Sequence, residues 1–402
     1  MKKNIVIIGV NYYPEDTAIG LYTTQKAEYL ATKGYKVQII TGVPYYPQWE
    51  IWDQYKKRSR WTKDDNSGIE IYRYKQYVPK NPNFRKRIAH LVSFTFGSFI
   101  NLFKVSKPDI VISIVPFTSS IFLGYLLKLR YRSKLWVHIQ DFEFDAAIDS
   151  GLLSSNKSII IKLLLFLEKA LLKKTDVVST ISKSMLTKLK EKTTKKGFYL
   201  PNWLDTEKFN EIHLRHPYLE SSKFKILYSG NIGKKQDWDF LQLFLEKIKT
   251  ISNVEVVIVG QGAQKQEVLK ATKTFSFVKH YDPVSFEDLP SLLSSADLHI
   301  LFQKDDVIDT VMPSKILGMM GSERPSIITG NKKSEVKKII EESKSGFYFQ
   351  SNQIEDLILA VKQLKDFPEL CDELGKNAKK FVIQNYSKEI ILNDFLCKLQ
   401  EI

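Results

Sequence analysis

The sequence predicts an α/β protein of two doubly wound domains that face each other, and three observations support this expectation. Residues 4–41 show the pattern strand, loop, helix and strand, with which a doubly wound sheet usually begins. The same alternation starts again at Phe224, after a polar stretch at residues 210–222. The chain has 402 residues, too many for one comfortable hydrophobic core. We therefore expect two similar Rossmann-like domains.

The expected boundary between the domains follows residue 203, within the turn-rich segment PNWLDTEKF. The N-terminal domain would comprise residues 1–203 and a returning helix at 385–402, and the C-terminal domain would comprise residues 204–384. The returning helix is predicted because apolar residues recur in it at helical spacing, namely Ile391, Leu392, Phe395, Leu396 and Leu399. That apolar face needs a partner, which we expect on the N-terminal domain.

The net charge of +15 indicates an anionic partner, which could be a nucleic acid, a phosphate-bearing ligand or an acidic membrane. The lysines are dispersed and no nucleic-acid motif is present, so we do not expect a nucleic-acid-binding protein. Cys371 and Cys397 lack metal-ligand spacing and suggest a reducing compartment. The first residues, MKKNIVIIGV, do not have the pattern of a signal peptide.

Two apolar stretches bear on membrane contact. Residues 110–127 are about long enough to span a bilayer, but Pro116 divides them, and we predict a buried strand at 110–115 and a helix from Ser119. In residues 83–107 a basic cluster precedes an apolar helix, which could lie in a membrane interface or belong to the core. We favour the core for the helix body and anionic lipid for the cluster, which comprises Arg85, Lys86 and Arg87.

The first loop, NYYPEDTAIG, is longer than the phosphate turn of a dinucleotide-binding domain and lacks its G-x-G-x-x-G pattern. We therefore do not expect a dinucleotide there. Gly20 lies near the start of the following helix, where a missing side chain would let a ligand approach the backbone. An ordinary turn glycine is the alternative.

Polar residues gather where the predicted strand 134–139 ends. They are the candidate catalytic residues His138, Asp141 and Glu143, together with Gln140 and Asp145. The carboxyl end of a strand is the expected place for a site in an open α/β sheet. A histidine within an apolar strand is often a structural residue, so His138 keeps two interpretations, whereas Asp141 or Glu143 would contact substrate.

A candidate phosphate site follows the predicted strand 298–302. Pro313 suits the first turn of a helix, and Ser314 and Lys315 come directly after it. A hydroxyl, an ammonium and unpaired backbone amides at a helix start favour a phosphate. The alternative is an ordinary βαβ unit with a solvated lysine.

A second candidate phosphate site follows the predicted strand 224–228. Small residues and lysines follow one another in SGNIGKKQ, and GQG comes after the next strand. The residues predicted to contact the phosphates are Gly230, Asn231, Gly233, Lys234, Lys235, Gln236, Gly260 and Gly262. A glycine turn with solvated lysines is the alternative.

Taken in order, these motifs resemble those of the retaining family 4 glycosyltransferases, which have the GT-B fold. The resemblance extends over nearly the whole chain, through NYYPEDTAIG, KGYKVQIIT, TDVVSTIS, YLPNWLDTEKF, YSGNIGKKQ, VIVGQG, SSADLHI and MPSKILGMMGSERPSII. The segments HIQDFEFDAA, SGNIGKKQ and PSK are most similar to the subgroup of colanic-acid-type exopolysaccharide transferases.

The resemblance implies a hexosyl- or deoxyhexosyltransferase whose donor is a nucleotide-diphosphate sugar, with UDP favoured over GDP. The donor would bind mainly to the C-terminal domain. A lipid-linked saccharide acceptor would bind mainly to the N-terminal domain, so the enzyme would be peripheral on the inner face of the plasma membrane. Transfer would proceed with retention and without a metal, and Lys315, Ser314 and the Gly230–Gly233 loop would stabilise the departing diphosphate.

The sequence also departs from the family pattern. The departures are Thr310 and Gly318 for two glutamates, Asn231 and Gln236 for the donor-phosphate arginine and lysine, Gln140 for a histidine, and Trp203 for a glycine. Lys234 or Lys235 are the candidates to replace the missing donor-phosphate cations. Asp305 and Asp306 resemble a metal-binding pair, but acidic residues are common after a strand. Two alternatives remain open, a sugar-nucleotide epimerase of the same fold and a catalytically inactive scaffold that binds sugar nucleotides.

Overall fold

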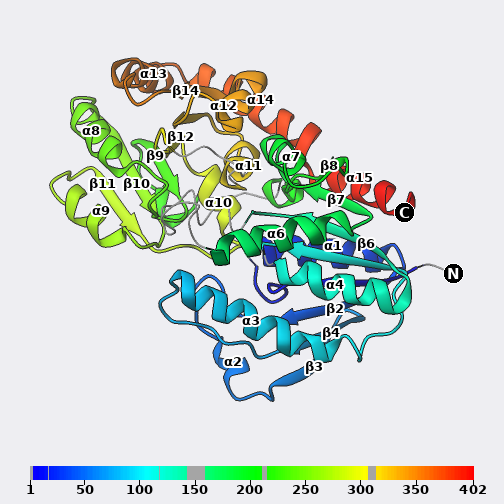
Figure 1. Ribbon diagram of the computed structural model, residues 1–402. Coiled ribbons are helices and arrows are strands. Elements are labelled where there is room, and N and C mark those ends of the chain that lie inside the picture. Colours follow the sequence, from blue (N-terminus) through cyan, green and yellow to red (C-terminus); the bar gives the residue numbers. More distant parts are fainter. Residues whose placement is uncertain (1–2, 17, 117, 143–158, 211–214, 307–313) are drawn as a thin grey trace. The chain divides into compact units, whose positions relative to one another are not determined.

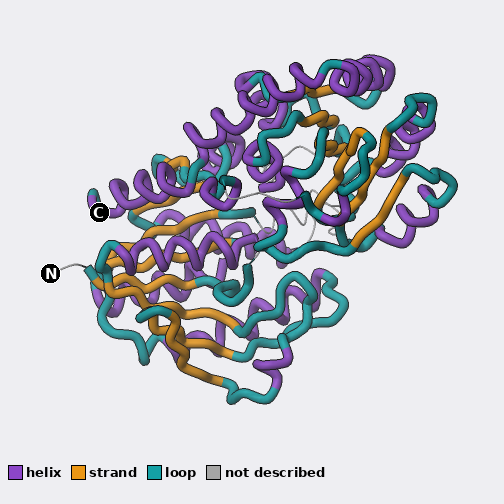
Figure 2. The backbone as a smooth tube through the Cα atoms, turned by 180° about the vertical axis from the view of Figure 1, so that it is seen from behind, coloured by secondary structure: helices purple, strands orange, loops and turns teal. Residues whose placement is uncertain are grey.

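The computed structural model describes residues 3–402 except 17, 117, 143–158, 211–214 and 307–313. The chain divides into two compact units (Figure 1). Unit 1 comprises Met1–Pro201 and Leu392–Ile402, and unit 2 comprises Asn202–Ile391. Each unit contains a mainly parallel sheet flanked by helices, drawn in orange and purple in Figure 2. The predicted two-domain α/β fold is therefore confirmed.

The sheet of unit 1 has the strand order β3-β4-β2-β1-β5-β6-β7-β8. Neighbouring strands run parallel except β3 and β4, which form an antiparallel pair at one edge. The strands are β1 (Asn4–Ile8), β2 (Lys36–Gly42), β3 (Trp61–Asn66), β4 (Ile69–Tyr74), β5 (Ile110–Val115), β6 (Lys134–Ile139), β7 (Val177–Thr180) and β8 (Gly197–Tyr199). The central strands β1, β5 and β6 are almost entirely buried and apolar, as expected where helices cover both faces of a sheet.

The helices of unit 1 cover both faces of its sheet. They are α1 (Ala18–Thr32), α2 (Asp53–Lys56), α3 (Phe84–Asn101), α4 (Thr118–Tyr131), α6 (Ile159–Lys173), α7 (Lys183–Lys190) and most of α15 (Lys388–Gln400). The crossover through α1 runs along the sheet in the direction opposite to the crossovers through α3, α4 and α6. Because parallel crossovers are right-handed, α1 lies on one face and the other three lie on the opposite face.

The last helix returns to unit 1, as predicted. The ring of Phe395 in α15 packs on Trp136 of β6, with 5.1 Å between the ring centroids. The ammonium of Lys26 in α1 lies 5.3 Å from the centroid of the same phenylalanine ring. Helix α15 therefore shares the α1 face of the sheet, and its apolar residues Leu392, Phe395 and Leu399 are buried there.

The sheet of unit 2 has the order β11-β10-β9-β12-β13-β14, and all its neighbours run parallel. Its strands are β9 (Phe224–Ser229), β10 (Val254–Val259), β11 (Val278–Tyr281), β12 (Leu298–Phe302), β13 (Ser326–Thr329) and β14 (Gly346–Phe349). Its helices are α8 (Trp238–Ile248), α9 (Lys265–Thr272), α10 (Leu289–Ser294), α11 (Ser314–Gly321), α12 (Glu335–Ser343), α13 (Ile354–Asp366) and α14 (Pro368–Tyr386), with the short 3-10 turns Thr206–Phe209 and Pro217–Leu219.

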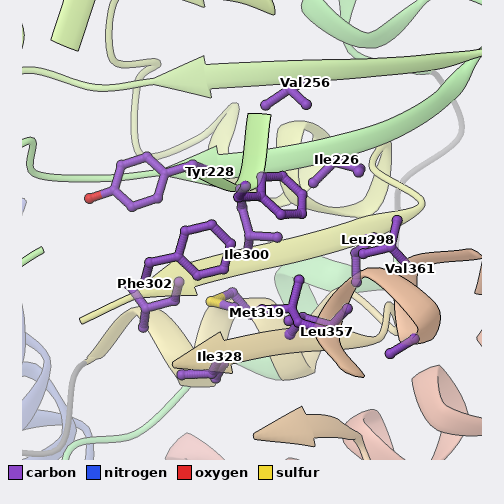
Figure 3. Packing of buried hydrophobic residues seen from close by; sticks show 14 of the residues in the cluster. Ile226, Tyr228, Val256, Leu298, Ile300, Phe302, Met319, Ile328, Leu357 and Val361 are labelled. Atoms are coloured by element: carbon purple, nitrogen blue, oxygen red, sulfur yellow. The ribbon is translucent and has the colours of Figure 1, made fainter. Parts of the chain in front are cut away.

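The core of unit 2 fills the space between its sheet and the covering helices (Figure 3). Side chains of β9 and β12 meet Met319 of α11 and Leu357 and Val361 of α13 there. Tyr228 belongs to this cluster through its ring, whereas its hydroxyl points away from the other labelled side chains. The hydroxyl thereby reaches the edge of the sheet where the strands end.

The apolar stretch 110–127 forms β5 and most of α4, as the sequence predicted. Among the helices that the structure describes, none is long and apolar enough to cross a bilayer.

Candidate functional site

The carboxyl edge of the unit 2 sheet brings the predicted phosphate-binding residues together. Strands β10, β9 and β12 are neighbours, and each ends at this edge. The loops after β9 and β10 contain the predicted glycines, and α11 supplies the predicted lysine. We call the group formed by Tyr228, residues 230–233, residues 260–262 and Lys315 the lysine site.

Lys315 is the cation at the centre of the lysine site. Its Nζ donates a hydrogen bond to Tyr228 Oη at 3.0 Å and lies 4.7 Å from the centroid of the same ring. Burial lowers the pKa of Lys315 from 10.5 to about 8. Among the described residues no carboxylate forms an ion pair with it. A charged, partly desolvated ammonium without an acidic partner is a favourable place for a bound anion.

The glycines of the lysine site are required by close packing rather than by open space for a ligand. A Cβ atom on Gly230 would lie 2.2 Å from Lys315 Cε, and the φ angle of Gly230 is +137°. A Cβ on Gly260 would lie 2.0 Å from the Gly230 carbonyl oxygen, and one on Gly262 would lie 2.1 Å from the Ile232 carbonyl oxygen. The two loops therefore touch backbone to backbone, which only glycine allows.

Backbone amides of the first loop already donate hydrogen bonds inside the site. Gly230 N donates to Val259 O at 2.9 Å, and Ile232 N donates to Gln261 O at 2.8 Å. Gly233 N donates to the side-chain oxygen of Gln236 at 3.2 Å. These three amides therefore already have acceptors within the protein, whereas the side chains of Asn231, Lys234 and Lys235 in the same loop are exposed.

Gln236 and Ser314 are two further residues of the predicted phosphate sites. Gln236 is buried, and its side chain closes the turn that begins at Gly233, which is a structural role. Ser314 is the first residue of α11, so its backbone lies at the helix start as predicted. The predicted Pro313 and the family position Thr310 lie outside the described residues.

The carboxyl edge of the unit 1 sheet contains His138 in a closed hydrogen-bond network. Gln140 Nε2 donates to His138 Nε2 at 3.0 Å, so the ring proton is on Nδ1, which donates to Ser179 Oγ at 2.9 Å. Ser179 Oγ also accepts from Trp136 Nε1 at 2.7 Å. Burial, with a smaller contribution from the Lys26 charge, lowers the pKa of His138 well below 6.5. The neutral, fully bonded ring fits the structural interpretation.

The other predicted residues of unit 1 have separate positions. Asp141 directly follows Gln140 after the end of β6 and is half-buried there, whereas Glu143 and Asp145 lie outside the described residues. Gly20 is buried against Glu15, because a Cβ on Gly20 would lie 2.8 Å from the Glu15 backbone oxygen. The missing side chain of Gly20 is thus explained by packing.

Two buried ionisable groups near this edge were not predicted from the sequence. Burial raises the pKa of Glu15 to about 7, although its carboxylate accepts from Tyr45 N, Tyr46 N and Asn11 Nδ2 at 2.7 to 2.8 Å. Burial lowers the pKa of Lys26 in α1 to about 7. The sequence contained a signal for the burial of Lys26, because position 26 lies at helical spacing between Tyr22 and Leu30 on the buried side of α1.

The acidic pair Asp305 and Asp306 follows β12 by a few residues. The carboxylate of Asp305 accepts a hydrogen bond from Ser351 Oγ, and its backbone oxygen accepts one from Asn331 Nδ2. In the part of the chain that the structure describes, no three histidine, cysteine, aspartate or glutamate side chains are grouped as metal ligands would be.

Comparison with known sequences assigns each half of the chain to a family model. A model described as "Glycosyl transferase 4-like domain" matches residues 17–203, and one described as "Glycosyl transferases group 1" matches residues 211–381. The chain is 31% identical over 413 aligned positions to the "Putative colanic acid biosynthesis glycosyl transferase WcaI" of Escherichia coli K12, and the alignment covers 98% of each chain.

Comparison with solved structures finds the same architecture in more distant proteins. A sucrose-phosphate synthase from Thermosynechococcus elongatus superimposes with a TM-score of 0.75 at 14% identity, over 100% of this chain and 99% of the other. HepE of Anabaena, solved in complex with UDP-glucose, superimposes with a TM-score of 0.66 at 12% identity over all of both chains. Because the sequence identities are 14% and 12%, these structural similarities establish the fold alone.

Proposed function

This chain belongs to the group 1 glycosyl transferases, and we propose that it moves a sugar from a nucleotide-diphosphate sugar to a lipid-linked saccharide during the synthesis of a surface polysaccharide. The family and the GT-B fold agree with the resemblance seen in the sequence. The polysaccharide assignment is supported by the relative from Escherichia coli, whose description names colanic acid biosynthesis.

The observation that carries the proposal is the position of Lys315 at the carboxyl edge of unit 2. Breaking the bond between a sugar and a nucleoside diphosphate leaves negative charge on the departing phosphate oxygens. An ammonium held within a desolvated, rigid site stabilises that charge as it develops. Lys315 meets this requirement, because its stem packs against Gly230 and its Nζ is held by Tyr228 Oη.

The proposed donor is a UDP-sugar, with a GDP-sugar as the second choice. Support comes from HepE, which has the same fold and was solved with UDP-glucose. Lys315 would contact the diphosphate, with Asn231, Lys234 and Lys235 as further contacts from the same loop. Charge neutralisation by lysine would make a metal ion unnecessary.

The proposed reaction retains the configuration of the transferred sugar. The acceptor oxygen bonds to the anomeric carbon on the face from which the phosphate oxygen departs, and the acceptor proton passes to that oxygen. No covalent enzyme intermediate is needed. Asp141, at the carboxyl end of β6, would hold a hydroxyl of the acceptor or the sugar.

The proposed lipid-linked acceptor would place the enzyme on the inner face of the plasma membrane. The basic cluster Arg85, Lys86 and Arg87 supports this location, because all three side chains are exposed at the start of α3.

The experiment that tests the proposal begins with the melting temperature of the protein measured with UDP-sugars and GDP-sugars. A ligand that binds only the folded state raises this temperature. The stabilising donor is then incubated with and without membrane lipids that carry the acceptor, in the presence of EDTA. We expect sugar transfer that depends on the lipid and survives EDTA.

Each other outcome contradicts a defined part of the proposal. Conversion of the donor sugar without an acceptor would indicate an epimerase. Donor binding without transfer to any lipid-linked saccharide would indicate an inactive scaffold. Transfer that EDTA abolishes and magnesium restores would overturn the metal-independent mechanism.

A further inference from the structure

Three helices on one face of the unit 1 sheet expose large apolar side chains to solvent. Helices α3, α4 and α6 lie there in that order, with α4 packed against both of the others (Figure 1). Phe96 of α3 is 75% exposed and Phe166 of α6 is 67% exposed. Phe103, Phe122, Leu129 and Leu163 are further exposed residues of the same surface, which we call the three-helix face. Large exposed apolar side chains gathered on adjoining helices are typical of an interaction site.

The exposure follows from how the helices are fixed on the sheet. A Cβ on Gly97 would lie 2.1 Å from the Tyr74 ring, and Trp61 Nε1 donates to the Gly97 carbonyl at 2.9 Å. A Cβ on Gly124 would lie 2.3 Å from Ser113 Oγ. Close approach at these two glycines sets the rotation of α3 and α4. Phe96, next to Gly97 on α3, is thereby held away from the sheet.

The charges on the three helices themselves are almost all positive, although Lys128 of α4 is paired with Asp176 at 2.6 Å. Helices α3 and α4 contain no aspartate or glutamate, and the single acid of α6, Glu168, is buried in an ion pair with Lys192 at 2.6 Å. The cations include the basic cluster Arg85–Arg87 at the start of α3 and Arg130, whose guanidinium lies 4.7 Å from the centroid of the Phe103 ring. Lys162 and Lys169 add exposed cations on α6. The face thus combines apolar side chains with a cationic rim.

We propose that the three-helix face inserts its aromatic residues into the interfacial region of an anionic lipid bilayer, while the rim cations contact lipid phosphates. A bilayer surface offers apolar depth and negative charge together, which is the complement of this face. A symmetric pair of chains joined through the same face would instead oppose cation to cation. The inference deepens the proposed membrane location, and it rests on the proposed function only for the identity of the acceptor.

The test is flotation of the full chain with vesicles of phosphatidylcholine and phosphatidylglycerol, and with vesicles of phosphatidylcholine alone. We expect binding to the anionic vesicles that weakens as salt is raised. The variant Phe96→Ser with Phe166→Ser should lower the vesicle partition coefficient at least about tenfold, because two bulky side chains leave the interface. The matched control is Leu243→Ser with Leu359→Ser, which removes two exposed leucines of unit 2 and should bind like the unmodified chain.

Melting temperatures of both variants should stay close to that of the unmodified chain, since all four side chains are exposed. Absence of flotation at low salt, or equal binding by the two double variants, would overturn the inference. So would self-association without vesicles that Phe96→Ser with Phe166→Ser abolishes, because this would assign the face to a second copy. All these measurements omit donor and acceptor. A chain that floats but transfers no sugar would therefore contradict the proposed function alone.

Discussion

The central polar residues at the carboxyl edges of the two sheets differ in the hydrogen-bond and ion-pair partners that they already have. In unit 1, both ring nitrogens of His138 are engaged, and burial keeps the ring neutral. In unit 2, Lys315 Nζ donates to the Tyr228 hydroxyl and forms no ion pair with any residue that the structure describes. The first arrangement is complete without a ligand, whereas the second leaves a cation able to bind one.

A strand end therefore identifies where a site can form, but the number of existing partners decides whether a residue is available for chemistry. Four experiments test whether the two edges differ in this way.

The largest effect is expected from Lys315→Ala. Removing the ammonium from a desolvated site should lower turnover about 10²–10³-fold, the usual loss for one electrostatic stabiliser. Steady-state rates with the identified donor measure this effect.

The comparison variant is Lys235→Ala, which removes an exposed lysine that we propose as a weaker contact to the diphosphate. Exposed charges contribute little, so we expect a change within about fivefold. A larger loss of turnover in Lys235→Ala than in Lys315→Ala would indicate that the loop, and not Lys315, provides the main phosphate contact. It would therefore contradict the contrast between the two edges.

The next effect concerns the rigid loops of the lysine site. In Gly260→Ala the new Cβ would lie 2.0 Å from the Gly230 carbonyl oxygen. Since both atoms belong to backbone, we expect a loss of about 3 kcal/mol in the free energy of unfolding, at the upper end for overpacking.

Chemical denaturation compares this variant with Gly318→Ala. The Cβ added to Gly318 meets only the movable Leu293 side chain at 3.0 Å, within the helix α11. Helix propensity favours alanine there by roughly 1 kcal/mol, so this variant should be neutral or slightly stabilised. Similar destabilisation in both variants would contradict a backbone contact specific to Gly260.

A smaller effect is expected from Ser179→Ala in unit 1. The change removes the acceptor for Trp136 Nε1 and His138 Nδ1, and two buried donors lose their partner. We expect about 2 kcal/mol less stability with turnover of the folded enzyme nearly unchanged. A large loss of turnover at unchanged stability would instead indicate that His138 takes part in the reaction.

The smallest effect is the pH dependence of binding to the nucleoside diphosphate. The pKa of Lys315 is about 8 in the free protein, so the lysine is charged below pH 8 and increasingly neutral above it. Affinity should therefore fall as pH rises above 8, with a slope approaching about tenfold per unit, because each pKa unit corresponds to 1.36 kcal/mol. Isothermal titration calorimetry between pH 7 and 9 measures this slope.

Lys315→Arg is the control for this measurement, because arginine stays charged throughout the range. We expect a flatter pH profile for it, whatever its absolute affinity. An equally steep profile in the arginine variant would assign the titration to another group.

The sequence predicted the buried strands well and the edge strands poorly. Ile110–Val115, Lys134–Ile139 and Leu298–Phe302 form strands with the predicted bounds, because continuous apolar runs are distinctive where both faces are covered. The hairpin of β3 and β4 was missed. Its first strand reads WTKDDN, and alternating polar residues at a sheet edge give no apolar run, although the turn at Ser67 and Gly68, both at positive φ, was a usable signal.

The sequence placed the candidate residues at the correct strand ends but could not give their partners. The Gly230 amide donates to the carbonyl oxygen of Val259, which belongs to the neighbouring strand β10. Spacing along the chain does not reveal this pairing, so the sequence could not show that the amide already has an acceptor. The same applies to His138, whose partner Ser179 comes from β7. Resemblance to the family supplied the reaction class, which patterns of charge and periodicity alone left open.

The position of helix α15 limits how the protein can be divided into separately expressed units. The boundary between the units falls within this helix, after Ile391, so the chain passes from one unit to the other twice. A recombinant fragment of the first two hundred residues would lack Phe395, so Trp136 would keep Phe198 but lose the nearer of these two aromatic neighbours. Isolating unit 1 therefore calls for a fusion that grafts residues 392–402 onto it, or for supplying that peptide in trans.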